Sequence, residues 1–185
     1  NLPDDERLLK KRAYKDIEHV ASAFKHCLDK DFVFKSSYAE RAESTAKHFL
    51  KQLGIPETHL HIESDLYTFD ESSLKAFLYT VDDSLDNLML FGHNPAFTNL
   101  ANTLGDQYFD NLPTSGLVMM HFKNSSWKDL ASGKTILHLL KQSAVDCIFN
   151  KHGNIVKIDK NNKKQTSSKP SPPNPFSGLD NNPSA

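Results

Sequence analysis

This sequence has little cysteine, no long apolar run and almost no excess charge of either sign. Its two cysteines, Cys27 and Cys147, make neither a disulfide framework nor the spacing of a metal site, which favours a reducing, cytoplasmic location. It has no run of about 18 apolar residues, so no membrane span is expected, and no secretory leader is recognisable at its start. Lys and Arg number 22 against 23 Asp and Glu, so bulk charge predicts binding to neither nucleic acid nor a membrane surface.

Glycine-rich and metal-binding signatures are also missing. The chain has seven glycines, and none of them forms a phosphate loop of the Walker type. His59 and His61 alternate along a predicted strand, but no further ligands follow at the spacing of a zinc site. The sequence therefore gives no reason to expect a metal.

The composition changes near residue 159. Residues 159–185 hold five of the nine prolines and almost no large apolar side chains, so this segment cannot offset its ordering entropy by burial. We expect residues 1–158 to form one domain and residues 159–185 to be a disordered tail.

The folded part alternates between two hydrophobic periods. Helical spacing predicts helices, and short apolar runs predict strands. This alternation is typical of an α/β fold with mainly parallel strands. The predicted helices cover 10–29, 37–53, 71–80 and 95–104, and the predicted strands cover 31–37, 60–63, 88–91, 116–122 and 134–140.

Two strand-to-helix turns place polar side chains where ligands bind in open α/β sheets. After one strand comes His93, where Asn94 is a good N-cap and Pro95 fits the first helical position. After another comes Ser37, which with Glu40 forms a capping-box pattern that leads into Arg41. An arginine in the first helical turn is disfavoured by the helix dipole, so either Glu40, Glu43 or solvent compensates Arg41, or a bound anion does.

Together, "SSYAERAESTA" (36–46) and "LFGHNPAFTNLA" (90–101) resemble the paired signatures of the histidine phosphatase superfamily, and most of all its SixA-like phosphohistidine phosphatases. Supporting matches are "DERLLKKRAYKD" (5–16), "DLY" (65–67), "LPTSGLVMMHF" (112–122) and "SSWKDL" (125–130). The resemblance implies the phosphoglycerate mutase-like fold, a three-layer sandwich with helices on both faces of a mainly parallel sheet.

The same resemblance implies the chemistry. Arg41 would bind a phosphoryl group bidentately, a protonated His93 would contact another of its oxygens, and Arg7 would lie near the phosphate. The alternative for Arg7 is a surface residue paired with Asp4 or Asp5. A neutral histidine would attack phosphorus, and water would hydrolyse the phosphohistidine, with no metal or organic cofactor. Asn94 stands where acid phosphatases of the superfamily carry a proton donor, which argues against that branch. The carboxylates available as general acid are Glu63, Asp65, Asp70 and Glu71.

The family's nucleophile lies in an R-H-G or R-H-A triplet that ends its first strand, upstream of the position matching Arg7. The sequence given begins after that point, so we expect a domain that lacks this strand and leaves its neighbours with unpaired backbone groups. Two readings of residues 147–158 stay open. Either Lys151-His152-Gly153 supplies the nucleophile by circular permutation, or strands 147–149 and 155–158 form a hairpin.

Three functions remain after the sequence is read. The first is a monomeric cytoplasmic phosphatase acting on a phosphorylated protein, through its phosphohistidine, or on a small phosphate compound. The second is a non-catalytic phosphate-binding or interaction module that has lost the nucleophile. The third, a phosphomutase, is disfavoured because the chain is small and lacks segments that would cover a substrate.

Overall fold

The computed structural model describes residues 2–25, 31–123, 126–131, 133–139, 148–149 and 155–156. The predicted element types are confirmed, and most boundaries move by a few residues. No helix in these ranges is long and apolar enough to cross a membrane. The helices are α1 (Lys11–Phe24), α2 (Glu40–Leu53), α3 (Glu71–Leu78) and α4 (Ala96–Leu104), and the strands are β1 (Val33–Ser36), β2 (Leu60–Ile62), β3 (Leu88–Phe91), β4 (Leu117–His121), β5 (Lys134–Leu139), β6 (Ile148–Phe149) and β7 (Ile155–Val156), with short 3₁₀ turns at Glu57–His59, Ser64–Leu66 and Trp127–Asp129.

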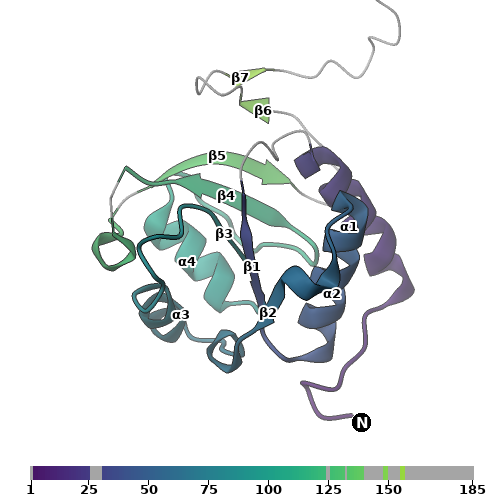
Figure 1. Ribbon diagram of the computed structural model, residues 1–185. Helices are drawn as coiled ribbons and strands as arrows, with labels where there is room; N and C mark the ends of the chain where they lie inside the picture. The colour runs from purple at the N-terminus through teal and green to yellow at the C-terminus, as the bar shows by residue number, and fades with distance from the viewer. Residues whose placement is uncertain are drawn as a thin grey trace, which may run out of the picture.

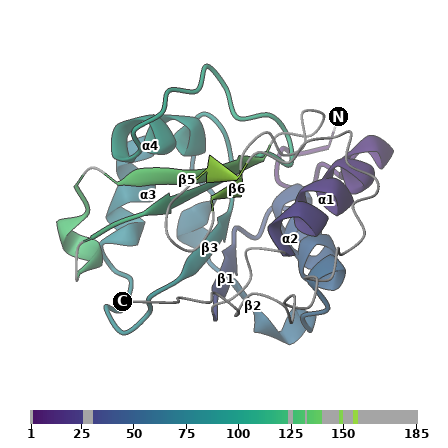
Figure 2. The same cartoon turned by 90° about the horizontal axis from the view of Figure 1, so that it is seen from above.

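The centre of the molecule is a parallel sheet in the order β2-β1-β3. Helices α1 and α2 lie on one side of it, and α3 and α4 on the other (Figure 1). The predicted three-layer α/β fold is therefore confirmed. Strands β4 and β5 pair with each other in antiparallel fashion, and in the view from above they lie over the space between the two helical pairs (Figure 2).

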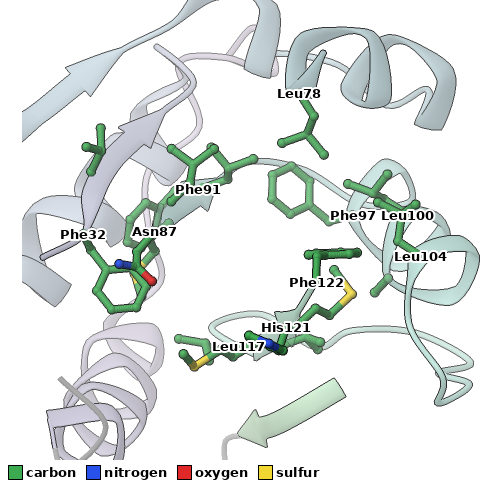
Figure 3. A pocket seen from close by; sticks show the side chains of 18 of the residues that line it. Phe32, Leu78, Asn87, Phe91, Phe97, Leu100, Leu104, Leu117, His121 and Phe122 are labelled. Carbon is green, nitrogen blue, oxygen red and sulfur yellow. The ribbon is translucent and has the colours of Figure 1, made fainter. Parts of the chain in front are cut away.

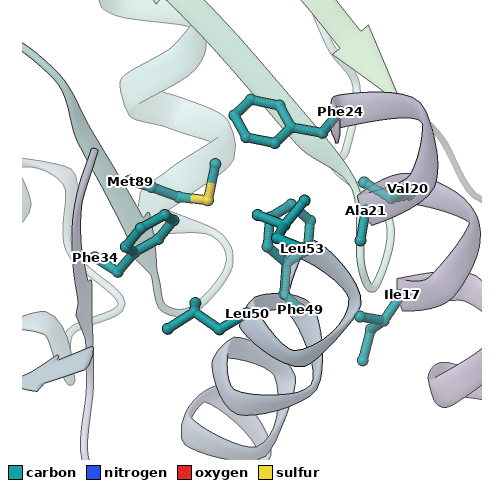
Figure 4. Close-up of a cluster of buried hydrophobic side chains, with 9 residues drawn as sticks. All are labelled: Ile17, Val20, Ala21, Phe24, Phe34, Phe49, Leu50, Leu53 and Met89. Atoms are coloured by element: carbon teal, nitrogen blue, oxygen red, sulfur yellow. The ribbon is translucent and has the colours of Figure 1, made fainter. Parts of the chain in front are cut away.

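Two clusters of buried side chains hold the layers together. One joins α1 and α2 to the sheet through interdigitated residues such as Phe24, Phe49, Phe34 and Met89 (Figure 4). The other joins α3 to α4 on the opposite side and includes Leu74 and Leu104. Because each helix contributes an apolar stripe at helical spacing, the sequence pattern alone explains which faces are buried.

A cavity of about 1020 Å³ separates β3 from β4. Its walls are mostly apolar and come from both strands, from α1 and from α4, where Phe97, Leu100 and Leu104 face the space (Figure 3). Among the described strands, β3 pairs only with β1, and β4 pairs only with β5. The edges of two sheets therefore face one another across an apolar space.

Some predictions concern residues outside the described ranges. The last predicted turn of the first helix, including Cys27 and Leu28, is one of them, as are His152 and the tail 159–185. The antiparallel pairing of β6 with β7 agrees with the hairpin reading of this region.

Candidate active site

Ser37 and His93 lie side by side because the strands that precede them are parallel neighbours. Ser36, the last residue of β1, is in register with Phe91, the last residue of β3. The main-chain N–H of Ser37 donates to the carbonyl oxygen of Phe91 at 3.1 Å. Both chains then leave the sheet at its carboxyl edge, which is the edge where the sequence predicts a ligand site.

The structure brings Arg41 and His93 together. Nη2 of Arg41 lies 3.2 Å from Nδ1 of His93, and Oγ of Ser37 lies 2.7 Å from Nε2 of the same ring. Guanidinium nitrogens only donate, so Nδ1 accepts and the neutral ring carries its proton on Nε2. Ser37 then accepts that proton in a hydrogen bond, which fixes both the tautomer and the orientation of the imidazole.

The predicted helix-capping role of Ser37 is wrong. Helix α2 begins at Glu40 with Ala39 as its N-cap, and no side chain caps it. Ser37 is fully buried and bonds His93 instead. The capping-box pattern failed because the helix begins only at Glu40, while Ser37 stays paired with the neighbouring strand through Phe91.

The predictions of Asn94 as N-cap and Pro95 as first helical residue are each wrong by one position, although Asn94 still bonds the first turn of the helix. Helix α4 begins at Ala96, with Pro95 in the N-cap position. Oδ1 of Asn94 accepts from the main-chain N–H and the hydroxyl of Thr98, at 3.2 and 2.9 Å. The amide nitrogen of Asn94 donates to the carbonyl oxygen of Leu112. Asn94, the residue after His93, is thus bound both to α4 and to the loop before β4.

His93 is buried and neutral at pH 7. His93 is 4% exposed. This burial, together with the nearby Arg41 guanidinium, lowers the pKa of His93 to about 4. The protonated state of His93, which is expected beside a bound phosphoryl group, stays a prediction. Two aromatic rings contribute to the burial, with centroids 5.2 Å (Tyr67) and 5.5 Å (Phe69) from the imidazole.

The sequence does not predict that Asp4 binds the guanidinium of Arg41. Oδ2 of Asp4 accepts from Nη2 of Arg41 at 2.7 Å and from Tyr67 Oη at 3.2 Å, and the main-chain oxygen of Asp4 accepts from Nη1 of Arg41. The hydrogen bond from Arg41 is the main cause that lowers the pKa of Asp4. The position of Arg41 in the first turn of α2 suggests that a carboxylate lies beside it. Nothing in the sequence tells which carboxylate this is.

Arg7 contacts Asp4, which links it to Arg41. Its Nη1 donates to Oδ1 of Asp4 at 3.4 Å, and its side chain is 66% exposed. The structure therefore places Arg7 at the outer rim, where it is paired with an acidic neighbour.

The other candidates have structural partners or lie apart from the pair. Glu63 is bound to Lys35 at 2.5 Å, and Asp70 caps α3 by accepting from the main-chain N–H of Ser73. Asp65 accepts from its neighbour Ser64, and Glu71 lies in the first turn of α3. Across the described ranges, no three His, Cys, Asp or Glu side chains are grouped to hold a metal, and His59 and His61 belong to no such group.

No protein-family model matches this sequence, and no curated protein sequence matches it. Solved structures do match. The protein histidine phosphatase SixA complexed with tungstate aligns with a TM-score of 0.63 at 16% identity, covering 77% of this chain and 90% of that one.

Two further structures that carry the name SixA align to a similar extent. The protein from Nakamurella multipartitia aligns at a TM-score of 0.59 and 15% identity, covering 77% of this chain and 89% of that one. The protein from Agrobacterium tumefaciens aligns at 0.58 and 21% identity, covering 75% and 86%. This chain therefore has a SixA-like histidine phosphatase fold.

Proposed function

We propose that this protein is a phosphatase that removes a phosphoryl group through a phosphohistidine intermediate, with protein phosphohistidine as its substrate. The observation that carries the proposal is the 3.2 Å contact between Arg41 and His93 at the carboxyl ends of two neighbouring parallel strands. A phosphoryl group held there would meet a guanidinium and an imidazole.

Arg41 supplies the fixed positive charge for this reaction. Its Nη1 donates to the main-chain oxygen of Asp4 and its Nη2 to a carboxylate oxygen of Asp4, so both terminal nitrogens point at oxygen acceptors. A guanidinium can bind two oxygens of one phosphoryl group through these same two nitrogens. The transferring phosphoryl group spreads negative charge over its equatorial oxygens, so a preorganised fork in a partly buried site stabilises the transition state.

His93 becomes a stronger donor when the anion arrives. A nearby dianion favours the imidazolium and so raises the pKa of His93 from its low value in the free protein. The added proton goes to Nδ1, because Nε2 already donates to Ser37. Nδ1 faces Arg41, so the new donor points toward the same bound anion.

The aromatic rings beside this pair suit a flat leaving group. Tyr67 and Phe69 flank His93. Tyr38 packs against Tyr67 with centroids 4.9 Å apart and the rings tilted by 47°, and Tyr38 and Phe69 are about half exposed. Stacking on such a surface favours an imidazole or aryl ring attached to phosphorus. An imidazole leaves readily once protonated, so this substrate does not require a strong general acid.

The attacking histidine needs a place in the structure. Within the described part of the chain, no second histidine bonds Arg41 or His93. We propose that the attacking imidazole stands at the carboxyl end of a strand that lies in the cavity between β3 and β4. A strand parallel to β3 in that space would pair with both free edges and would end beside His93.

Phosphate release tests the function. The full-length protein is incubated with a phosphohistidine peptide and with an aryl phosphate, and we expect turnover that falls at least ~100-fold in His93→Ala and Arg41→Ala. His59→Ala is the matched control, because it removes an exposed histidine away from the site. Acid-labile phosphate on the protein would identify the intermediate, and equal rates in His93→Ala and His59→Ala would refute the proposal.

A second candidate function, phosphate binding without catalysis, is favoured by the absence of a second histidine from the described site. In this case Arg41 and His93 bind phosphate or a phosphorylated partner but never turn it over. Arg41-dependent binding of tungstate, together with no phosphate release from either substrate, would support this candidate over the enzyme.

A further inference from the structure

We propose that Asp4 is an internal competitor for the anion site: its carboxylate occupies the place on Arg41 that a phosphoryl oxygen takes, and it must leave before the substrate binds. This inference rests on the phosphoryl-transfer function proposed above and adds a means of controlling that site from the N-terminal segment.

Three side chains donate to the Asp4 carboxylate. Nη2 of Arg41 lies 2.7 Å from Oδ2, Tyr67 Oη lies 3.2 Å from the same oxygen, and Nη1 of Arg7 lies 3.4 Å from Oδ1. Carboxylate and phosphoryl oxygens are recognised by the same guanidinium fork. An anion that used this set of donors would therefore have to replace Asp4.

The two anions exclude each other by charge as well as by space. Nη2 of Arg41 is shared between Asp4 and His93, so an oxyanion placed between Arg41 and His93 would lie within a few ångströms of the carboxylate. Like charges at such a distance repel, so a bound oxyanion disfavours the carboxylate in this position. An aspartate is ionised at neutral pH in any case, and the hydrogen bond from Arg41 lowers the pKa of Asp4 further.

The segment that carries Asp4 is held lightly enough to move. Leu2 and Leu8, its apolar residues on either side, are 60% and 70% exposed, and the Asp4 side chain itself is 43% exposed. One main-chain bond, from the Glu40 N–H to the Asp5 carbonyl oxygen at 2.8 Å, ties the segment to the start of α2. Exposed ion pairs are weak, so the competitor can yield to a dianion.

The test measures tungstate binding to the full-length protein by calorimetry. Asp4→Asn keeps the size of the side chain and removes its charge, and we expect it to tighten tungstate binding about threefold to tenfold. Glu6→Gln removes the same charge from an exposed neighbour on the same segment and is expected to leave the affinity unchanged. Asp4→Glu keeps the charge and is expected to bind tungstate no more tightly than the wild type.

The outcomes separate this inference from the proposed function. If the wild type binds tungstate in an Arg41-dependent manner and Asp4→Asn binds it equally or more weakly, Asp4 is no competitor and the function stands. If Asp4→Asn and Glu6→Gln gain equally, the effect is one of net charge and the inference fails. If no variant binds tungstate, Arg41 is not an anion site and both proposals fail.

Discussion

Each ring nitrogen of His93 has one partner, and these two partners decide what the residue can do. Ser37 holds Nε2, and Arg41 faces Nδ1. In the free protein a cation beside a buried imidazole disfavours the charged ring. His93 is therefore ready to gain a proton only when an anion compensates Arg41, so its charge depends on occupancy of the site.

The first prediction concerns stability against pH. The unfolded chain binds a proton at His93 with a pKa of 6.5, whereas the folded protein binds it only at about 4. Between these values the unfolded state binds more protons, so the free energy of unfolding falls as the pH falls from 6.5 toward 4. The His93→Gln variant has no group that titrates at this position. Over the same pH range its free energy of unfolding should therefore fall less than that of the wild type, by up to about 3 kcal/mol.

Urea unfolding of both proteins at pH 7, 6, 5 and 4.5 measures this difference. The carboxylates whose pKa is lowered, Asp4, Asp70, Asp82 and Asp106, are present in both proteins, so their contribution largely cancels. Parallel stability curves for the two proteins across this range would show that His93 is not held neutral by its surroundings.

The second prediction concerns Ser37. Ser37→Ala leaves the Nε2 proton of His93 without its acceptor in a buried place, which should cost about 1–3 kcal/mol of stability. It should also lower phosphate release, because the imidazole loses the bond that sets its tautomer. Ser44→Ala, which removes an exposed hydroxyl bonded to Glu40, is the control for both readouts. Nitrogen NMR of the ring checks the tautomer directly, and an unchanged spectrum in Ser37→Ala would contradict the role given to Ser37.

At the level of elements, the sequence predicts the strands and helices that carry the site, but it does not predict the contacts between them. The strands β1 and β3 and the helices after them follow from short apolar runs and helical spacing, which are local signals. Whether Ser37 caps a helix or bonds a histidine is decided by the pairing of β1 with β3, which is a contact between residues 56 positions apart. The position of Asp4 is likewise fixed by a contact over 37 positions.

The third prediction concerns the start of α4. Asn94→Ala removes the acceptor for Thr98 and the donor to Leu112, and it should cost about 1–2 kcal/mol of stability. Asn94→Asp keeps the acceptor at the helix start and loses only the donor, so it should be less destabilising. Chemical denaturation compares the two variants. If both are equally stable to the wild type, the loop from His93 to Ala96 is positioned by other contacts.

For the whole molecule, the cavity between β3 and β4 connects the fold to the function. The two sheets stand apart there, and their facing edges lie on either side of a mostly apolar space. Apolar walls on both faces suit a fully buried parallel strand, and such a strand would bring its carboxyl end to Arg41 and His93. Sequence reasoning expects unpaired backbone groups, but the size of the space and its lining are properties of the packed structure.

The last prediction tests whether a strand fills this cavity. In the full-length protein, we expect the edge amides of β3 and β4 that face the cavity to exchange with solvent at least ~100-fold more slowly than those on the outer edge of β2. The outer edge of β2 is a fair comparison, because β2 is the other end of the same parallel sheet and pairs only with β1 among the described strands. A strand in the cavity would bond the facing amides of β3 and β4, whereas those of β2 would remain open to water. Hydrogen exchange read by NMR gives the rate for each amide. Equal, fast exchange at all three edges would show that no strand lies between the sheets. Arg41 and His93 could then still bind a phosphoryl group, but no neighbouring imidazole would be in place to attack it.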